Sequence, residues 1–267
     1  MKVEQPITLP IKDFVDEAEG IRTFFFDYNI NSKPGQFFLL WIPGLNEKPF
    51  GVASEHKNGF STTISNVGPF TQTLFEMEKG SLVGIRGPYG TSFNTDEKLK
   101  NVILIGGGYG SAPLSFLADK LASQGAKIDF IIGAKTANKL VYRKRRFHDN
   151  ITIHYCTDDG TFGAKCFSTD LFEKLLNGKN YDFAYACGPE IMMKKVVEIC
   201  DKENLECEIS LERYIKCGIG VCGQCCVDDL GIRMCVEGPV ISKELAKKIS
   251  EFGKYKRDAS GIKVKLN

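Results

Sequence analysis

The sequence has no cysteine in its first 155 residues, although it contains ten cysteines among 267 residues. A secreted protein of this size that depends on disulfides would place bridges in both halves, so the distribution argues against a disulfide scaffold. Five of the ten cysteines lie between Cys217 and Cys235. Such a tight group in an intracellular chain favours a metal-binding segment.

Long hydrophobic runs and an excess of one charge are also missing. The longest run without a charged residue, 102–118, has 17 residues, fewer than the roughly 20 apolar residues that span a bilayer. Lys and Arg number 35 against 33 Asp and Glu, so the chain has no strong field for nucleic acid. The N-terminus carries early charge and no apolar core, so we expect no secretory signal. These features predict a cytoplasmic protein that binds neither membrane nor nucleic acid.

The chain is long enough for about two ordinary domains, and its 43% hydrophobic and 25% charged residues are typical of a globular protein. Residues 1–96 consist of apolar stretches separated by turn residues, which predicts an antiparallel β-barrel. We expect one short helix there, at 71–77. The expected strands of this first domain are 21–26, 35–42, 50–53, 60–65 and 82–86.

Residues 97–211 have a different pattern, in which apolar strands alternate with helical segments. This alternation predicts a parallel sheet of the nucleotide-binding kind. Residues 212–267 contain the cysteine group and an amphipathic segment at 242–252 that we expect to be a helix. The predicted fold is therefore an α+β multidomain chain with a barrel, an α/β nucleotide domain and a small C-terminal cluster segment. The strands expected in the second domain are 101–105, 128–132, 151–155 and 183–186, and the helices are 113–123, 168–176 and 189–202.

The cysteine group has the spacing Cys217-x4-Cys222-x2-Cys225, with Cys235 nine residues further on. The spacing of the first three cysteines matches a plant-type two-iron ferredoxin site, and glycines between the ligands allow a loop to wrap closely around a cluster. Structural zinc sites usually have two separate Cys-x2-Cys pairs, so the pattern favours iron–sulfur but leaves zinc open. Cys226 could replace Cys225, although we interpret it as a small buried hydrophobic residue.

Two further motifs each follow an expected strand and precede an expected helix. Gly106-Gly107-Gly108 could let the backbone approach a phosphate at a helix N-terminus. A tight structural turn explains this glycine run equally well. Cys187-Gly188-Pro189 ends a late strand, at the edge where ligands of parallel sheets bind, although a buried cysteine would explain it too.

The combination of motifs is more specific than any one of them. Their order along the chain resembles that of the ferredoxin-reductase-like flavoproteins. With the four cysteines and Glu237-Gly238-Pro239-Val240 included, nearly the whole chain resembles the electron transfer subunits of B-type dihydroorotate dehydrogenases. The motifs in this order are Lys33-Pro34-Gly35-Gln36-Phe37, Gly87-Pro88-Tyr89-Gly90, Gly106-Gly107-Gly108, Thr157-Asp158-Asp159-Gly160 and Cys187-Gly188-Pro189.

The resemblance implies which residues bind cofactors. The family holds FAD through an Arg-Pro-x-Ser stretch, to which Lys48-Pro49-Phe50-Gly51 corresponds here. Lys48 keeps a charge for the pyrophosphate without the bidentate fork of arginine, and Gly51 lacks the hydroxyl near the flavin ring. Ile64-Ser65-Asn66 corresponds to the next flavin strand, and Phe70-Thr71 to a Gly-Thr pair at a helix start. Cys217, Cys222, Cys225 and Cys235 would bind the 2Fe-2S cluster.

The resemblance also implies a function for the chain. This function is electron transfer, and no residue of the chain would catalyse the oxidation of dihydroorotate itself. NAD(P) would bind the second domain and exchange hydride with FAD, which exchanges single electrons with the cluster. An FMN-containing catalytic subunit would then oxidise dihydroorotate in pyrimidine biosynthesis, as a heterotetramer with two copies of each chain. Two alternatives remain: a subunit of a related NAD(P)H:ferredoxin or sulfide-linked oxidoreductase, and a zinc-binding structural module without cofactors.

Overall fold

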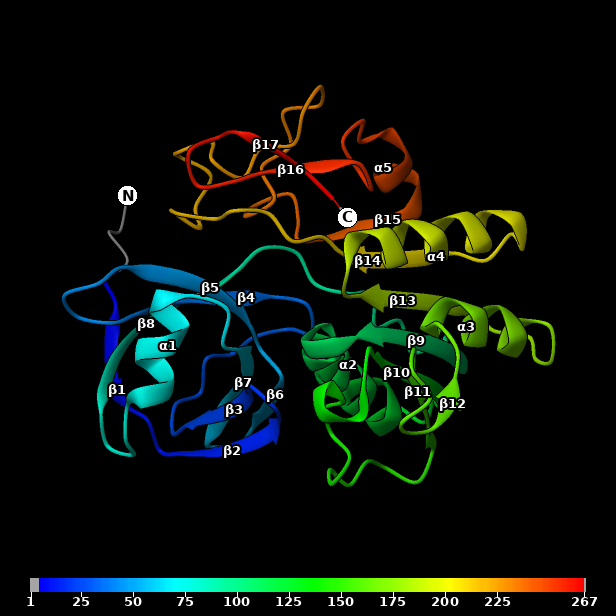
Figure 1. Cartoon of the computed structure of the whole chain (residues 1–267), viewed down its shortest axis with the longest axis horizontal. Coiled ribbons are helices and arrows are strands. Elements are labelled where there is room, and N and C mark those ends of the chain that lie inside the picture. The colour runs from blue at the N-terminus through cyan, green and yellow to red at the C-terminus, as the bar shows by residue number, and fades with distance from the viewer. Residues whose placement is uncertain (1–4, 267) are drawn as a thin grey trace.

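The computed structural model describes residues 5–266 of the chain. In Figure 1 the N-terminal barrel is blue to cyan, a mostly parallel sheet with its helices is green to yellow, and the C-terminal segment is orange to red. This arrangement of an antiparallel part, an α/β part and a small C-terminal segment confirms the predicted fold class.

Two antiparallel sheets of the described chain form the barrel, in the orders β1-β8-β4-β5 and β2-β3-β7-β6. Side chains alternate along the strands, so Phe60 and Ile64 of β7 enter the barrel core, while Thr63 bonds to Tyr142 of the next domain. Helix α1 packs Leu74 into the same core. The elements are β1 (Ile7–Pro10), β2 (Asp13–Ala18), β3 (Ile21–Phe26), β4 (Phe37–Trp41), β5 (Glu47–Gly51), β6 (Ser54–His56), β7 (Gly59–Ser65), α1 (Pro69–Glu76) and β8 (Leu82–Tyr89).

The second domain is built on a sheet in the order β12-β11-β10-β9-β13-β14-β15. Strand β9 is buried on both faces: Ile103 packs with Phe172 of α3 and Val196 of α4, while Leu104 packs with Leu117 of α2. This burial explains the uninterrupted apolar run of the strand. The elements are β9 (Asn101–Gly107), α2 (Ser111–Ser123), β10 (Lys127–Ala134), β11 (Ile151–Thr157), β12 (Ala164–Lys165), α3 (Ser168–Leu176), β13 (Phe183–Cys187), α4 (Glu190–Lys202) and β14 (Cys207–Ser210), with 3-10 turns at Gly108–Gly110 and Ala137–Lys139.

The strand order reverses between β9 and β13, and the two predicted motifs of this domain meet at that point. A Cβ atom on Gly107 would lie 2.5 Å from Cδ of Pro189, and one on Gly188 would lie 2.9 Å from Cα of Gly107. Glycine is thus required at both positions for the close approach of two backbones. The crevice at such a reversal is where open α/β sheets bind ligands.

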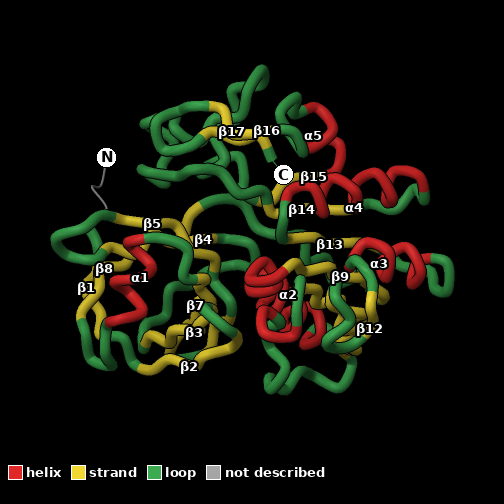
Figure 2. Tube along the Cα trace, in the orientation of Figure 1, coloured by secondary structure: helices red, strands yellow, loops and turns green. Residues whose placement is uncertain are grey.

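The C-terminal segment begins with a loop that has little regular structure, drawn mainly as green tube in Figure 2. Strand β15 (Val240–Ser242) then joins the nucleotide sheet antiparallel to β14. Helix α5 (Lys243–Lys248) is shorter than the predicted 242–252 because the backbone of Ile249 turns to an extended conformation, although Ile249 and Phe252 stay buried. The hairpin of β16 (Tyr255–Arg257) and β17 (Lys263–Lys265) completes the segment. Within residues 5–266, the helices are too short or too polar to cross a bilayer.

Candidate functional site

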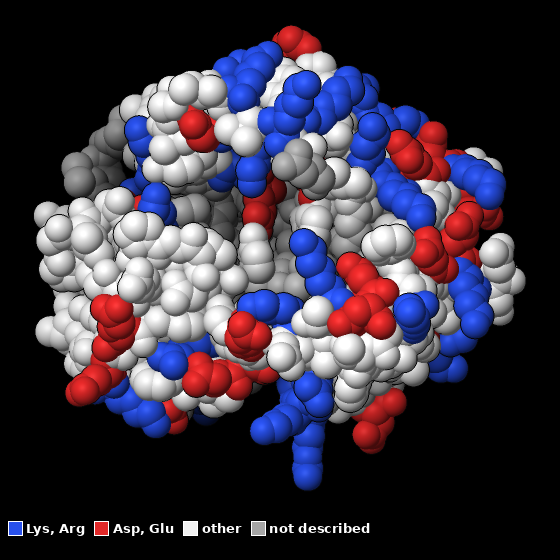
Figure 3. Space-filling view, in the orientation of Figure 1, with Lys and Arg blue, Asp and Glu red and all other residues white. Residues whose placement is uncertain are grey.

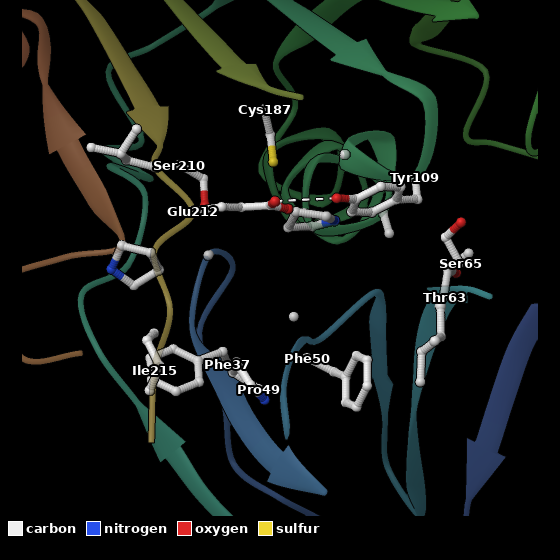
Figure 4. A pocket seen from close by; sticks show the side chains of 18 of the residues that line it. Phe37, Pro49, Phe50, Thr63, Ser65, Tyr109, Cys187, Ser210, Glu212 and Ile215 are labelled. Atoms are coloured by element: carbon white, nitrogen blue, oxygen red, sulfur yellow. Dashed lines mark hydrogen bonds between the residues drawn. The ribbon is translucent and has the colours of Figure 1, made fainter. Parts of the chain in front are cut away.

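A cavity of about 260 Å³, here called the central cavity, lies where the barrel, the nucleotide domain and residues 210–215 meet. Figure 3 shows the surface hollowed between these parts, with acidic atoms visible inside the hollow. Figure 4 shows the side chains that point into the cavity. The residues that line it are Gly35, Phe37, Pro49, Phe50, Gly51, Thr63, Ile64, Ser65, Val67, Thr71, Tyr109, Gly110, Ala112, Pro113, Cys187, Ser210, Leu211, Glu212, Arg213, Ile215 and Pro239.

Most of the FAD-binding residues predicted on the barrel reach the central cavity. Strand β5 contributes three of them, β7 contributes two, and Thr71 comes from the first turn of α1. Thr71 Oγ1 accepts hydrogen bonds from the amides of Val67 and Gly68, at 3.0 and 3.1 Å, which fixes the backbone at the start of that helix. The predicted residues in the lining are Pro49, Phe50, Gly51, Ile64, Ser65 and Thr71.

Three predicted residues of the barrel lie outside the lining that the described residues form. The ammonium of Lys48 lies 3.2 Å from the hydroxyl of Tyr214 and above its ring. Phe70 stacks behind Phe50 with ring centroids 6.0 Å apart. Asn66 accepts a hydrogen bond from Thr71 at 3.3 Å. These side chains shape the wall, and a direct role for them in cofactor binding stays a prediction.

Gly51 leaves an open space at the wall of the cavity. A Cβ atom at this position would meet only Pro113, at 3.8 Å, which is an ordinary van der Waals distance. The position is therefore free to accept a side chain or to lie directly against a ligand. This open wall between β5 and α2 suits a flat ring system better than a polar, flexible ligand.

The nucleotide domain contributes the opposite wall of the cavity. Of the cofactor-binding residues predicted in this domain, only Cys187 belongs to the lining that the described residues form. Its thiol is buried, and burial raises its pKa well above the ordinary value. Gly106-Gly107-Gly108, Gly188 and Pro189 lie behind this wall. A Cβ atom on Gly106 would lie 2.4 Å from Oγ of Ser111, so packing accounts for this glycine, and phosphate binding by the run stays a prediction.

Tyr109 and Glu212 form a hydrogen bond across the cavity that the sequence did not reveal. The Tyr109 hydroxyl donates to Oε2 of Glu212 at 3.1 Å, as the dashed line in Figure 4 shows. The charge of Glu212 and the partial burial raise the pKa of Tyr109, and desolvation by the cavity walls raises the pKa of Glu212. Glu212 follows β14, so the rule that placed Cys187 at the carboxyl edge of the sheet could have found it.

The cysteine loop, residues 217–235, brings the four predicted ligands together in two pairs. All four are free thiols. The Cys222 thiol donates a hydrogen bond to the sulfur of Cys217, and the Cys235 thiol donates one to the sulfur of Cys225. Across residues 5–266, no three side chains of ligand type converge as they would around one metal ion. The arrangement is therefore pairwise, while the backbone of Cys226 forms an antiparallel β-bridge with Arg233.

Backbone amides point at the sulfur atoms of the cysteine loop. The amide of Gly220 donates to Sγ of Cys235 at 3.2 Å, and that of Cys235 to Sγ of Cys225 at 3.4 Å. Burial opposes ionisation of Cys217, but hydrogen bonds from the amides of residues 219, 221 and 222 outweigh it and lower its pKa to about 6. Such N–H···S contacts stabilise thiolates and are typical of cluster-binding loops.

The cysteine loop lies directly against the barrel beside the central cavity. Arg86 of β8 donates to the carbonyl of Cys217 at 2.9 Å. Gly218 has a φ of +76°, and a Cβ atom there would lie 3.0 Å from Leu39 and 3.1 Å from Tyr89. Ile215, two residues before the first cysteine, lines the cavity. The same short stretch of chain therefore contributes to both sites.

The cysteine loop matches a known family of domains. Residues 212–245 match the iron-sulfur cluster binding domain of dihydroorotate dehydrogenase B. Among solved structures, the chain is similar to an NADH-dependent reduced ferredoxin-NADP oxidoreductase studied for flavin-based electron bifurcation, with a TM-score of 0.81, 27% identity and 90% of each chain covered. It shares its fold with a cytochrome P450 reductase from Amycolatopsis, at a TM-score of 0.66 and 19% identity over 76% of this chain and 67% of that one.

Two archaeal proteins are similar over almost their whole length. One from Methanocaldococcus jannaschii is 45% identical over 98% of this chain and 99% of its own. One from Methanothermobacter thermautotrophicus is 40% identical over 97% of both chains. Each is named a probable electron transfer subunit of dihydroorotate dehydrogenase B (NAD(+)). On this similarity, the chain belongs to the family of dihydroorotate dehydrogenase B electron transfer subunits.

Proposed function

We propose that this chain transfers electrons between NAD(H) and a separate, FMN-containing subunit that oxidises dihydroorotate, using FAD and a 2Fe-2S cluster that it holds itself. The observation that carries the proposal is that Ile215, two residues before Cys217, lines the central cavity, while Cys217 and Gly218 lie against Arg86, Leu39 and Tyr89 of the barrel. A two-electron carrier in the cavity and a one-electron carrier in the loop would then be neighbours.

The central cavity fits the ring system of a flavin. Phe37, Phe50 and Ile215 supply apolar surface, while hydroxyl groups lie on the wall formed by β7. The cavity is smaller than typical ligand pockets, so the rest of a dinucleotide would extend out of it. The N-terminus of α1, at Val67 and Thr71, is the nearest place suited to a pyrophosphate. When bound, FAD would convert hydride transfer into single-electron transfer.

The residues of this chain that face the flavin position would orient the hydride donor and handle protons. Tyr109 and Glu212 together hold one proton between two oxygens that are 3.1 Å apart. Cys187 stays a neutral thiol because burial raises its pKa. The remaining predicted residues lie outside the cavity lining, and we propose that they bind the cofactors from there. They are Lys48, Asn66, Phe70, Gly106-Gly107-Gly108, Gly188 and Pro189.

The pairwise arrangement of thiols supports a diiron cluster over zinc. In a 2Fe-2S cluster each iron takes two protein ligands, which suits the pairs Cys217 with Cys222 and Cys225 with Cys235. A structural zinc ion needs four ligands around one point. The N–H···S contacts add to this preference, since they offset the negative charge of an iron–sulfur cluster.

Exposed apolar side chains around the cysteine loop support a partner subunit there. Ile219, Val221 and Leu230 of this loop, and Val236 directly after it, are exposed large hydrophobic residues. An apolar patch with a polar rim is typical of a protein–protein interface. Docking at this patch would place the cluster between the flavin position and the catalytic subunit, in a heterotetramer of two copies of each chain.

A second candidate is a subunit of an electron-bifurcating ferredoxin oxidoreductase. The observation that favours it is the similarity to the solved oxidoreductase over 90% of both chains. The full set of four cysteines and the higher identity to the archaeal relatives favour the dihydroorotate system.

The test is to isolate the chain anaerobically together with its neighbours in the cell. We expect a brown-yellow complex with about two irons per FAD, an FMN-containing partner, and reduction of NAD by dihydroorotate. A colourless preparation that contains zinc would contradict the cluster. An iron- and flavin-containing chain that co-purifies with a ferredoxin-reducing partner and does not respond to dihydroorotate would favour the second candidate.

A further inference from the structure

Arg213 lies in a buried ionic triad with two carboxylates from distant parts of the chain. Its Nε donates to Oε1 of Glu251 at 2.6 Å, and its Nη1 donates to Oε2 of Glu190 at 2.7 Å. The side chains of Arg213, Glu190 and Glu251 are 3%, 8% and 1% exposed. Two carboxylates and one guanidinium give this buried group a net charge of −1.

Both carboxylates of the triad also accept hydrogen bonds from backbone amides. Oε2 of Glu251 accepts from the amide of Asp228 at 3.0 Å. Oε1 of Glu190 accepts from the amide of Gly253 at 2.9 Å and also from Nη2 of Arg213 at 3.2 Å, so the Arg213–Glu190 pair is bidentate. Glu251 therefore binds Arg213, four residues before the first cysteine of the loop, and Asp228, three residues after Cys225. It therefore links the chain just before the cysteine loop to a point within the loop, between Cys225 and Cys235.

Glu190 connects the same group to the nucleotide domain. It is the first residue of α4 and directly follows Cys187-Gly188-Pro189. Arg213 itself lines the central cavity. The triad thus joins the carboxyl edge of the sheet, the cavity wall and the cysteine loop at Asp228. In the proposed function, electrons pass between the cavity and this loop.

The energetics indicate that this group is present for geometry rather than for stability. Apolar residues of similar volume are often as stabilising as a buried ion pair, whereas removal of one partner is strongly destabilising. A group with fixed bidentate hydrogen bonds, in contrast, defines positions to within a fraction of an ångström. Electron transfer between two centres depends steeply on the distance that separates them, so it is sensitive to such fixing.

We propose that Glu251 is a positioning residue for electron transfer, which fixes the cysteine loop relative to the central cavity by linking Arg213, before the loop, to Asp228 within it. This inference rests on the proposed function, because it needs a flavin in the cavity and a cluster in the loop. Glu251 does not line the cavity and is not a cysteine ligand, so it acts through Arg213 and the Asp228 amide.

The test is Glu251→Gln, which preserves the shape of the side chain. The glutamine NH2 group would face either the Arg213 guanidinium or the Asp228 amide, and both of these are hydrogen-bond donors. We expect iron and flavin contents equal to the wild type and an altered electron paramagnetic resonance spectrum of the reduced cluster. The rate constant from flavin to cluster should fall about tenfold, while flavin reduction by NADH stays within about twofold. Backbone hydrogen exchange should rise at residues 214–217 and 226–230.

The matched control is Asp129→Asn, since Asp129 is a buried carboxylate bound by His154, Lys179 and Tyr181 in the nucleotide domain. It should lower the melting temperature without changing the cluster spectrum or the exchange of the loop. A Glu251→Gln protein that melts lower but keeps the wild-type spectrum, transfer rate and loop exchange would overturn the proposal. A wild-type chain without iron or flavin would instead overturn the proposed function, and the exchange measurement would still test the positioning role.

Discussion

The cysteine loop and the central cavity are neighbours, but they are built in opposite ways. All ligand candidates of the loop lie within residues 217–235, and the amides that contact their sulfurs belong to the same stretch. The cavity takes its lining from residues between Gly35 and Pro239, on both domains and the C-terminal segment. One site is therefore local in sequence, and the other exists only when three parts of the chain pack together.

This difference means that the two sites can be damaged separately. Loss of a ligand should remove the cluster without disturbing the barrel or the sheet. A steric change between β9 and β13 should disturb the cavity wall and leave the local geometry of the cysteine loop largely intact. The following predictions, from the largest expected effect to the smallest, test whether the two sites are separable in this way.

The largest effect should come from Cys225→Ser in the cysteine loop. Serine is a poor ligand for iron, so the iron content should fall to near zero while the flavin content stays at the wild-type level. Metal analysis and the visible spectrum measure both. Cys226→Ser is the matched control and should keep its iron, because Cys226 is not one of the four predicted ligands, which hydrogen-bond in the pairs 217/222 and 225/235. The reverse result, with iron lost only from the Cys226 variant, would show that the ligand set is wrong.

Gly107→Ala should damage the other region. Its Cβ atom would lie 2.5 Å from Pro189 and 3.0 Å from Met192, so the turns after β9 and β13 must separate. We expect a loss of about 2 kcal/mol in the free energy of unfolding, as for other overpacked sites, and a melting temperature lower by about 6 °C. Gly178→Ala has only ordinary contacts in the same domain and should change little. Equal melting temperatures for the two variants would contradict the close packing of these motifs.

A smaller, pH-dependent effect is expected at Asp228, which attaches the C-terminal hairpin to the cysteine loop. Hydrogen bonds from Tyr255, Arg257 and Lys263 hold the pKa of Asp228 well below its ordinary value. A carboxyl with a depressed folded pKa stabilises the fold fully above its unfolded value of about 3.9, and the contribution is lost as the pH falls through the folded pKa.

Thermal melting at several pH values measures this contribution. Asp228→Asn should melt about 2 °C below the wild type near neutral pH, and the difference should shrink below a pH of about 4. A difference that stays constant down to pH 3 or so would show that the charge of Asp228 is not what holds the hairpin.

The smallest effect tests the open wall of the cavity at Gly51. Gly51→Ser should fit without strain, because Pro113 lies 3.8 Å from the added Cβ, and the hydroxyl should add about one hydrogen bond to the bound flavin. Fluorescence titration of the FAD-free protein should show binding tighter by about fivefold. Gly51→Ala adds the same Cβ without a hydroxyl and should leave the affinity unchanged. Equal affinities for Ser and Ala would place this wall away from polar atoms of the flavin.

The apolar strands could be predicted from the sequence, whereas the edge strands could not. Strand β3 spans the predicted residues 21–26, and helix α3 the predicted 168–176. Strands β2 and β6 were missed, and both lie at the edges of their sheet. The sequence of β2, Asp-Phe-Val-Asp-Glu-Ala, contains three acidic residues. Charged edge strands of this kind prevent aggregation but remove the apolar signal on which prediction depends.

The candidate site was predictable in its local part and not in its distant contacts. Spacing and glycines identified the cysteine loop, because its ligands and its backbone amides are close in the chain. The pairing of Tyr109 with Glu212 joins residues 103 positions apart. The approach of Lys48 to Tyr214 joins residues 166 positions apart. In both pairs, the sequence around each residue contains no pattern from which its contact partner could be predicted.

The sequence by itself determined the features that depend on interactions between residues close in the chain. These are the buried strands, the helices between them, and the tightly wrapped loop that the cysteine spacing requires. The tertiary structure alone decided which strand ends meet at the cavity, that Gly90 packs against Gly238, and that Glu251 links Arg213 to Asp228 of the cysteine loop. The physical reason is that local propensities act within a few residues, whereas these contacts depend on the packing of whole domains against one another.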